Sequence, residues 1–243
     1  MRIPAASRRT LGPLEALVVE GAAGAPAVVL FHGYGADAAD LAPLASALPL
    51  RLRPTWVFPE GPLSLGPAGW PGARAWFPID EQSLERAQFT GKPMDLAKGG
   101  AGAPEHFLQA SRLAGQALEA LAIPWDRLIL GGFSQGAMMA TDLALRAQTA
   151  PLGLAILSGA LIGSAHWEPL AASRAGLRFF QCHGGDDPLL SFNNAKALEA
   201  FLKNAGLKGE LLAFEGGHGI PPEAAEGLAR FIESFADAGA QRA

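Results

Sequence analysis

The feature that most constrains the fold is an alternation along the chain between short apolar runs and longer segments with helical periodicity. Several runs are continuously hydrophobic, which is typical of parallel strands buried on both faces. We predict strands at residues 16–19, 27–31, 55–58, 128–130, 153–157, 177–182 and 211–214. Helices are predicted at residues 38–48, 104–121, 136–147, 193–204 and 223–235. This order predicts an α/β fold with a mostly parallel central sheet of about seven strands and helices on both faces.

One long segment, residues 59–103, interrupts this alternation, and we refer to it as the excursion. It is rich in proline and glycine, shows no clean period and carries three aromatic residues within a short space, Trp70, Trp76 and Phe77. An irregular stretch of this length is usually either functional or disordered, and the aromatic residues favour a function. No change of composition resembles an interdomain linker. We therefore expect residues 1–243 to form a single domain, with the excursion bordering the active site.

Charge and cysteine content exclude several classes of protein. The net charge is −4 and the basic residues form no stripe, so we expect no nucleic-acid partner. The single cysteine, Cys182, excludes an intramolecular disulfide and a multi-cysteine zinc site. The first residues lack the continuous apolar run of a signal peptide, and the longest apolar stretch is too short for a membrane span. We expect a soluble, cytoplasmic protein.

Residues 132–136 match the pattern Gly-x-Ser-x-Gly, with Ser134 at the centre. A pattern this short also occurs by chance, so its context decides its meaning. It follows the apolar run at residues 128–130 and opens a helical pattern, which places Ser134 on a strand-to-helix turn. That context is typical of a nucleophile elbow, whereas the alternative is a glycine-rich turn that carries an ordinary serine.

A serine hydroxyl is a weak nucleophile at neutral pH and needs a base to activate it. The best candidate for this base is His218. His218 lies in a glycine-rich loop between the last predicted strand and the last predicted helix. The other four histidines are better explained as loop-organising, packed or solvated side chains: His32, His106, His166 and His183.

An acidic residue that orients the histidine should lie between Ser134 and His218 in the chain. Asp186 and Asp187 both follow the strand predicted at residues 177–182, and either carboxylate is positioned to reach His218. The residue pattern alone leaves both candidates open.

Attack on a carbonyl creates an oxyanion that needs backbone N–H donors. The N–H of Gln135 is one candidate because it follows the nucleophile. The glycine-rich loop at residues 33–35 supplies others, since its glycines let the backbone turn inward. The alternative for this loop is a tight connection to the next helix.

Six motifs occur in an order that resembles the phospholipase/carboxylesterase family, which includes the acyl-protein thioesterases. They are LFHGYGAD at 30–37, FPEGP at 58–62, WF at 76–77, ILGGFSQG at 129–136, LSG at 157–159 and CHGGDDP at 182–188. The similarity runs from about residue 26 to 220. It implies an α/β-hydrolase fold and ester hydrolysis without a cofactor or metal.

The resemblance also implies roles for single residues. It places the family's nucleophile on Ser134, its histidine on His218 and its acid on Asp187, the aspartate before a proline. The oxyanion amides fall on Tyr34 and Gln135.

Apolar residues of the excursion and its surroundings are candidates for an acyl-binding pocket: Leu65, Trp70, Trp76, Phe77, Phe89 and Leu161. The alternative for each is simple packing of the excursion onto the domain. Residues 78–103 are longer and richer in glycine and lysine than the family pattern leads us to expect, so the family's substrate preference is not carried over.

These features together predict a serine hydrolase that cleaves a small-molecule carboxylic ester, with thioesters and lysophospholipids as further substrate classes. Two alternatives stay open: a non-catalytic hydrolase-like protein that binds a small apolar ligand, and a peptidase or acyltransferase with the same triad. Exposed apolar groups in the excursion also leave a homodimer open.

Overall fold

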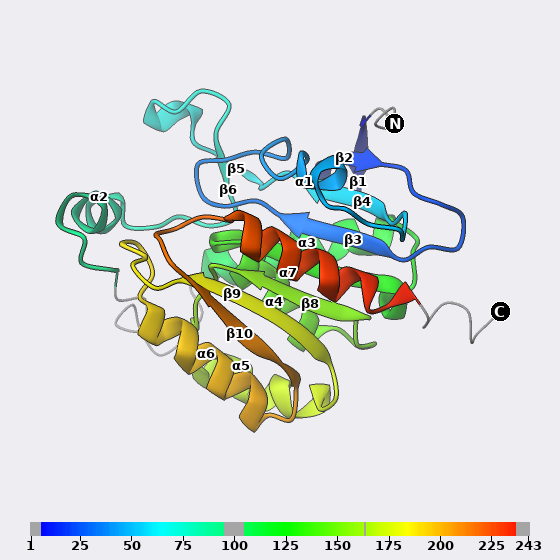
Figure 1. The fold of residues 1–243 in the computed structure, drawn as a ribbon. Helices are drawn as coiled ribbons and strands as arrows, with labels where there is room; N and C mark the ends of the chain where they lie inside the picture. The colour runs from blue at the N-terminus through cyan, green and yellow to red at the C-terminus, as the bar shows by residue number, and fades with distance from the viewer. Residues whose placement is uncertain (1–5, 95–104, 163, 237–243) are drawn as a thin grey trace.

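The computed structural model describes residues 6–94, 105–162 and 164–236, and its centre is an eight-stranded sheet (Figure 1). The strand order is β1-β2-β4-β3-β7-β8-β9-β10. The pairs β1/β2 and β2/β4 are antiparallel, and all other neighbours are parallel. The strands are β1 (Ser7–Leu11), β2 (Leu14–Val19), β3 (Ala27–Phe31), β4 (Thr55–Pro59), β7 (Leu128–Phe133), β8 (Gly153–Leu157), β9 (Arg178–Gly184) and β10 (Lys208–Phe214). The predicted α/β class and mostly parallel sheet are confirmed.

The predicted number of strands, about seven, is one too low because β1 was missed. Four of its five residues are exposed, and Arg8 and Arg9 interrupt any apolar run. An edge strand with charged side chains resists pairing with another chain, but it leaves no hydrophobic pattern in the sequence.

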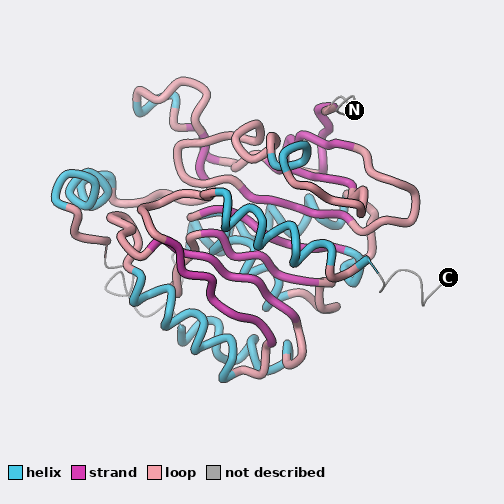
Figure 2. Tube along the Cα trace, viewed as in Figure 1, coloured by secondary structure: helices cyan, strands magenta, loops and turns pink. Residues whose placement is uncertain are grey.

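Helices cover both faces of the sheet (Figure 2). The helices of the chain are α1 (Leu44–Ala47), α2 (Glu81–Thr90), which lies away from the sheet, α3 (Glu105–Ala120), α4 (Gln135–Arg146), α5 (Ser164–Ala171), α6 (Phe192–Asn204) and α7 (Pro222–Glu233). Short 3-10 turns lie at Gly66–Ala68, Trp125–Arg127 and Ala172–Arg174, and a small hairpin pairs β5 (Leu63–Ser64) with β6 (Arg74–Ala75). No helix among the described residues is long and apolar enough to cross a membrane.

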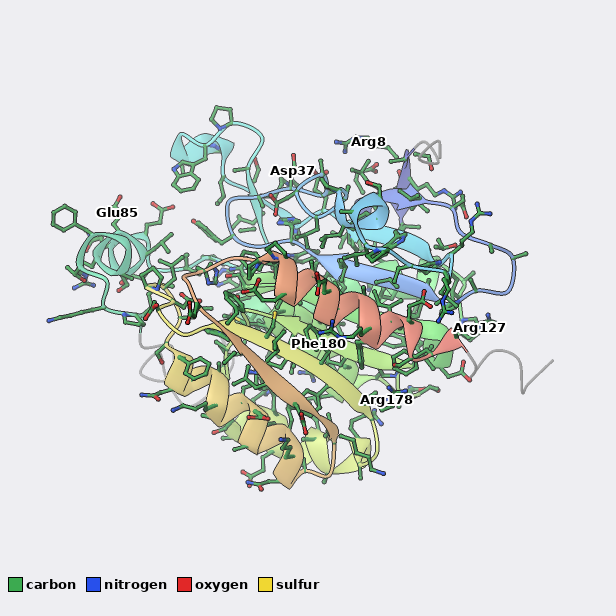
Figure 3. The ribbon with its side chains drawn as sticks, in the orientation of Figure 1. Arg8, Asp37, Glu85, Arg127, Arg178 and Phe180 are labelled. Atoms are coloured by element: carbon green, nitrogen blue, oxygen red, sulfur yellow. The ribbon has the colours of Figure 1, made fainter. Side chains whose placement is uncertain are left out.

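The central strands divide their side chains between two apolar cores. On β3, Val29 and Phe31 pack in the core that α3, α4, α5 and α6 cover, whereas Val28 and Leu30 pack in the core beneath α7. This alternation explains why β3 is buried along its whole length. Arg178 of β9 holds the end of α7, because it donates to the Ser234 hydroxyl and lies 4.4 Å from the centre of the Phe235 ring (Figure 3).

Three segments differ from the predicted helices. No helix was predicted at α5, whose pattern is interrupted by Pro169 inside the helix. Residues 38–43 form turns and only Leu44–Ala47 is helical, because the Asp37 carboxylate accepts the N–H of Ala39 and favours a local turn. The excursion contains a ten-residue helix, α2, that begins at the cap Asp80. It was missed because it buries little apolar surface, and Figure 3 shows its Glu85 far from the sheet.

The single-domain prediction for residues 1–243 stays a prediction. Residues 95–103 of the excursion, the predicted helix start at Pro104 and both chain ends lie outside the described residues.

A buried carboxylate fixes the helix that follows Ser134. Asp142 of α4 is fully buried and accepts hydrogen bonds from Ser111 of α3, from the Trp167 indole of α5 at 3.0 Å, and from Arg146 at 2.8 and 3.0 Å. One carboxylate thus joins three helices, and each of its bonds replaces water that burial removes.

We predict that Asp142→Ala lowers the free energy of unfolding by about 3 kcal/mol, because it leaves buried donors without an acceptor. Denaturant titration measures this loss. Glu226→Ala is the control, because it removes an exposed ion pair with Arg230 and should change the free energy by less than about 0.5 kcal/mol. Equal losses in the two variants would contradict the role of Asp142.

Candidate active site

Ser134 lies on the sharp turn between β7 and α4. Its backbone angles are φ 55° and ψ −117°, a conformation that is uncommon for a residue with a side chain. Its N–H donates to the Leu157 carbonyl at 2.9 Å, and its side chain makes no hydrogen bond that caps α4. The turn therefore presents the Ser134 hydroxyl to the surroundings instead of using it within the helix.

Two glycines permit this turn. A Cβ atom on Gly136 would lie 2.0 Å from the Phe31 carbonyl oxygen, and one on Gly132 would lie 2.4 Å from the backbone of Gly136. No side chain fits at either position without a shift of the backbone. The Gly-x-Ser-x-Gly pattern is thus explained by the close approach of α4 to the end of β3.

His218 lies in the loop after β10, and it lines the same pocket as Ser134. Its Nδ1 is 2.6 Å from Oδ2 of Asp187, so Nδ1 donates and Nε2 remains free to accept a proton. The ring packs 4.8 Å from the ring of Phe133. The Ser158 hydroxyl donates to the Gly219 carbonyl at 3.3 Å and holds the same loop.

The geometry separates the two aspartates that the sequence pattern left open. Asp187 is buried, and its Oδ1 accepts the N–H groups of Leu189 at 2.8 Å and Leu190 at 2.9 Å. Asp186 is exposed and only its backbone N–H is tied down, to the Gly216 carbonyl.

Asp187 is ionised at neutral pH. Burial acts to raise the pKa of this carboxyl group, but hydrogen bonds from His183, His218 and Leu190 outweigh burial and hold the pKa well below its ordinary value of 3.8. An ionised carboxylate beside Nδ1 stabilises a positive charge on the His218 ring.

The predicted oxyanion donors, Tyr34 and Gln135, line the same pocket as Ser134. Gln135 is the first residue of α4, where a backbone N–H has no partner within the helix. Tyr34 follows β3, and its hydroxyl donates to Glu81 at 3.1 Å. Burial, and to a smaller extent this hydrogen bond, raises the pKa of Tyr34 to about 12, so the phenol stays neutral.

His32 organises the loop that carries Tyr34, as the sequence suggested. Its Nε2 accepts the Gly61 N–H at 2.9 Å, so Nδ1 carries the proton and donates to the Gly33 carbonyl at 2.7 Å. Burial lowers the pKa of His32 and keeps the ring neutral.

The side chain of Gln135 has a role that the sequence did not reveal. Its Oε1 accepts the Trp76 N–H at 2.8 Å and its Nε2 donates to the Phe77 carbonyl at 2.7 Å. The Trp76 indole donates to the His32 carbonyl at 2.9 Å. These bonds tie the excursion to both elements that carry the candidate oxyanion donors. A lone glutamine beside Ser134 was the only sequence signal.

The pocket beside Ser134 has a volume of about 160 Å³ and is mainly apolar. It contains Trp70 and Phe77, two of the predicted acyl-pocket residues. Apolar side chains that the sequence analysis did not single out complete the lining: Ile79, Leu84, Met94, Met138, Ile162, Leu189 and Leu190. They come from five separate segments, so no local pattern could have grouped them.

The structure places the other four predicted pocket residues outside this lining. Leu65 and Trp76 are buried elsewhere, and Trp76 is held by its bonds to Gln135 and His32. Phe89 is 94% exposed on the outer side of α2. Leu161 precedes the lining residue Ile162, and its backbone is fixed by Asn194.

Other reactive groups are unsuited to the chemistry. Burial raises the pKa of Cys182 to about 12, so its thiol is no nucleophile at neutral pH. Among the described residues, no group of three or more His, Cys, Asp or Glu side chains is placed to hold a metal ion.

Comparison with known proteins identifies the family. Residues 14–236 match the family model described as Phospholipase/Carboxylesterase. The chain belongs to this family. The family indicated by the sequence motifs is therefore confirmed, and the protein is a hydrolase that acts on esters.

A curated relative and two solved structures are also similar to this chain. Acyl-protein thioesterase 1 of Eremothecium gossypii is 28% identical over 224 residues, which cover 87% of this chain and 88% of that protein. The crystal structure of esterase PE8 has a TM-score of 0.72 at 24% identity and covers 91% of this chain and 98% of its own. The carboxylesterase of Bacillus cereus has a TM-score of 0.68 at 19% identity, and the match covers 92% of this chain and 95% of that chain. The fold is that of the α/β-hydrolases.

We predict that Gly136→Ala lowers kcat/KM for an ester by about a hundredfold, because the new methyl group displaces the start of α4 and hence Ser134. The free energy of unfolding should fall by about 2 kcal/mol. Steady-state kinetics and denaturant titration measure the two effects.

Gly115→Ala, in the interior of α3, is the matched control. Its Cβ would lie 3.8 Å from Leu143, an ordinary contact, so stability should rise slightly and activity should not change. Full activity of Gly136→Ala would show that the close approach to Phe31 does not position Ser134.

Proposed function

We propose that the protein hydrolyses carboxylic esters and acyl thioesters through an acyl-enzyme on Ser134. The observation that carries this proposal is the shared pocket, in which Ser134 on its strained turn lies with His218, whose Nδ1 is held by the buried carboxylate of Asp187.

In the proposed reaction, Nε2 of His218 removes the proton from Ser134 as its oxygen attacks the acyl carbon. The N–H groups of Tyr34 and Gln135 donate to the resulting oxyanion, and each such donor is worth about 2.7–4 kcal/mol. His218 then protonates the leaving alkoxide or thiolate. Water, activated by the same nitrogen, attacks the acyl-enzyme and releases the acid and free Ser134.

The apolar pocket supports an acyl chain as the group that is transferred. Trp70, Phe77, Met138 and Leu190 offer a hydrophobic surface and no buried charge to a bound chain. The thioesterase name of the relative supports thioesters as substrates alongside oxygen esters.

We further propose a cytoplasmic location, in line with a free, buried Cys182 that needs no oxidising compartment. The homodimer stays a prediction.

We predict that Ser134→Ala abolishes turnover of p-nitrophenyl esters, with a loss of at least about a thousandfold, because the nucleophile is removed. Its Tm should stay close to that of the unmodified protein. Ser173→Ala, which changes an exposed serine, is the control and should keep full activity. Unchanged turnover in Ser134→Ala would overturn the proposal.

A fluorophosphonate probe tests the same point against the non-catalytic alternative. Only a serine activated by a base reacts with such a probe. Labelling of Ser134 supports catalysis, whereas a protein that merely binds an apolar ligand would stay unlabelled. Product analysis with water and amine acceptors distinguishes hydrolysis from acyl transfer.

We predict that Asp187→Asn lowers kcat by about ten-thousandfold, because an amide cannot stabilise the charged ring of His218. Asp186→Asn is the matched control one residue away and should stay within about threefold of the unmodified protein, because that side chain is exposed. The reverse order of effects would show that Asp186 is the acid.

A further inference from the structure

Two histidines share one oxygen of the Asp187 carboxylate. Nδ1 of His218 lies 2.6 Å from Oδ2, and Nε2 of His183 lies 3.1 Å from the same atom. The reaction proposed above uses His218 alone. His183, on β9, is fully buried and has no part in it.

The contacts of His183 define its protonation state. Nε2 also lies 2.9 Å from the Leu190 carbonyl, and neither this carbonyl nor the ionised carboxylate can donate, so Nε2 carries a hydrogen. Nδ1 is buried and has no hydrogen-bond partner within the described part of the chain. A proton there would be an unpaired donor on a fully buried cation, which is costly. The contacts therefore place the ring hydrogen of His183 on Nε2.

We propose that His183 is a positioning residue: its Nε2–H, which lies 2.9 Å from the Leu190 carbonyl and 3.1 Å from Oδ2 of Asp187 and is shared between them, fixes the carboxylate and sets how strongly it binds the protonated ring of His218. This inference rests on the proposed function. A hydrogen bond to a carboxylate oxygen takes up part of its negative charge, so less is left to hold a proton on the other partner. In this proposal, His183 limits how tightly the carboxylate holds a proton on His218, which eases transfer of that proton to the leaving group.

His183 also connects the acid to the pocket wall. Its Nε2 contacts the Leu190 carbonyl, while the Leu190 N–H binds Oδ1 of Asp187. Leu190 lines the pocket, and its neighbour Leu189 accepts the N–H of Met94 at 2.9 Å. The same histidine therefore holds the carboxylate and the loop that surrounds it.

Few other charged side chains lie near the Asp187 carboxylate. Among the described residues, His183 and His218 are the titratable side chains recorded in contact with Asp187. The rings that pack on the two histidines, Phe192 and Phe133, are uncharged. The thiol of the neighbouring Cys182 is neutral, and the side chains of Asp186 and Glu215 are exposed. A change in the pKa of His218 on mutation of His183 is therefore attributed to the Asp187 carboxylate that both histidines contact.

The test compares His183→Leu, which removes the donor, with His183→Gln, whose amide N–H stands near the position of Nε2. The pKa of His218 is measured by NMR titration of the imidazole signals. It should rise by about half to one unit in His183→Leu, because more negative charge remains on Oδ2, and should stay close to the unmodified value in His183→Gln. The acidic limb of the kcat/KM profile should move to higher pH by the same amount.

Turnover provides the second readout. At a pH above this limb, kcat should fall by about tenfold in His183→Leu, with a small change in KM, and should recover in His183→Gln. Gln181→Leu is the matched control, because Gln181 is buried two residues earlier on β9 and donates to Ala195 without contacting Asp187. It should lower stability while leaving the pKa of His218 unchanged.

Three results would overturn the proposal. They are an unchanged His218 pKa in His183→Leu, equal shifts in the Leu and Gln variants, or a proton on Nδ1 of His183 in the unmodified protein at neutral pH. The last measurement needs no mutant, so it decides even if His183→Leu fails to fold. NMR titration also needs no substrate, so a failure of the proposed function, seen as an unlabelled Ser134, is distinguishable from a failure of this inference.

Discussion

The active site depends on one close contact, the approach of the start of α4 to the end of β3. Gly136 touches the carbonyl of Phe31 so closely that no side chain fits between them. This contact forces the chain through the strained conformation of Ser134 and brings the first N–H groups of α4 beside the loop that carries Tyr34. The proposed nucleophile and the proposed oxyanion donors are thus positioned by backbone packing rather than by flexible side chains.

Hydrogen bonds then connect the rest of the site to this contact. Gln135 holds the backbone of Trp76 and Phe77, so the excursion that supplies part of the apolar pocket is fixed to the nucleophile's own helix. Asp187, with both carboxylate oxygens engaged, holds His218 through Nδ1. The apolar pocket and the proposed catalytic groups are therefore connected by one set of hydrogen bonds.

Much of the fold could be predicted because buried parallel strands leave continuous apolar runs, as β3 and β8 do. The Gly-x-Ser-x-Gly turn could also be predicted, since its glycines are required where the backbone packs too closely for a side chain. By contrast, exposed β1 and the weakly buried α2 leave no such pattern. Asp186 and Asp187 are neighbours in the chain and differ in the burial and hydrogen bonds of their side chains, which the residue pattern does not show. The pocket lining joins distant segments, so it could not be predicted from local patterns either.

The most direct test of the central claim is mass spectrometry of the protein quenched during turnover of a p-nitrophenyl ester. The account predicts an adduct with the mass of the acyl group on the peptide that contains Ser134, absent in Asp187→Asn quenched at the same early time. An acyl adduct on another residue, or steady turnover in which the unmodified protein never carries one, would contradict the account.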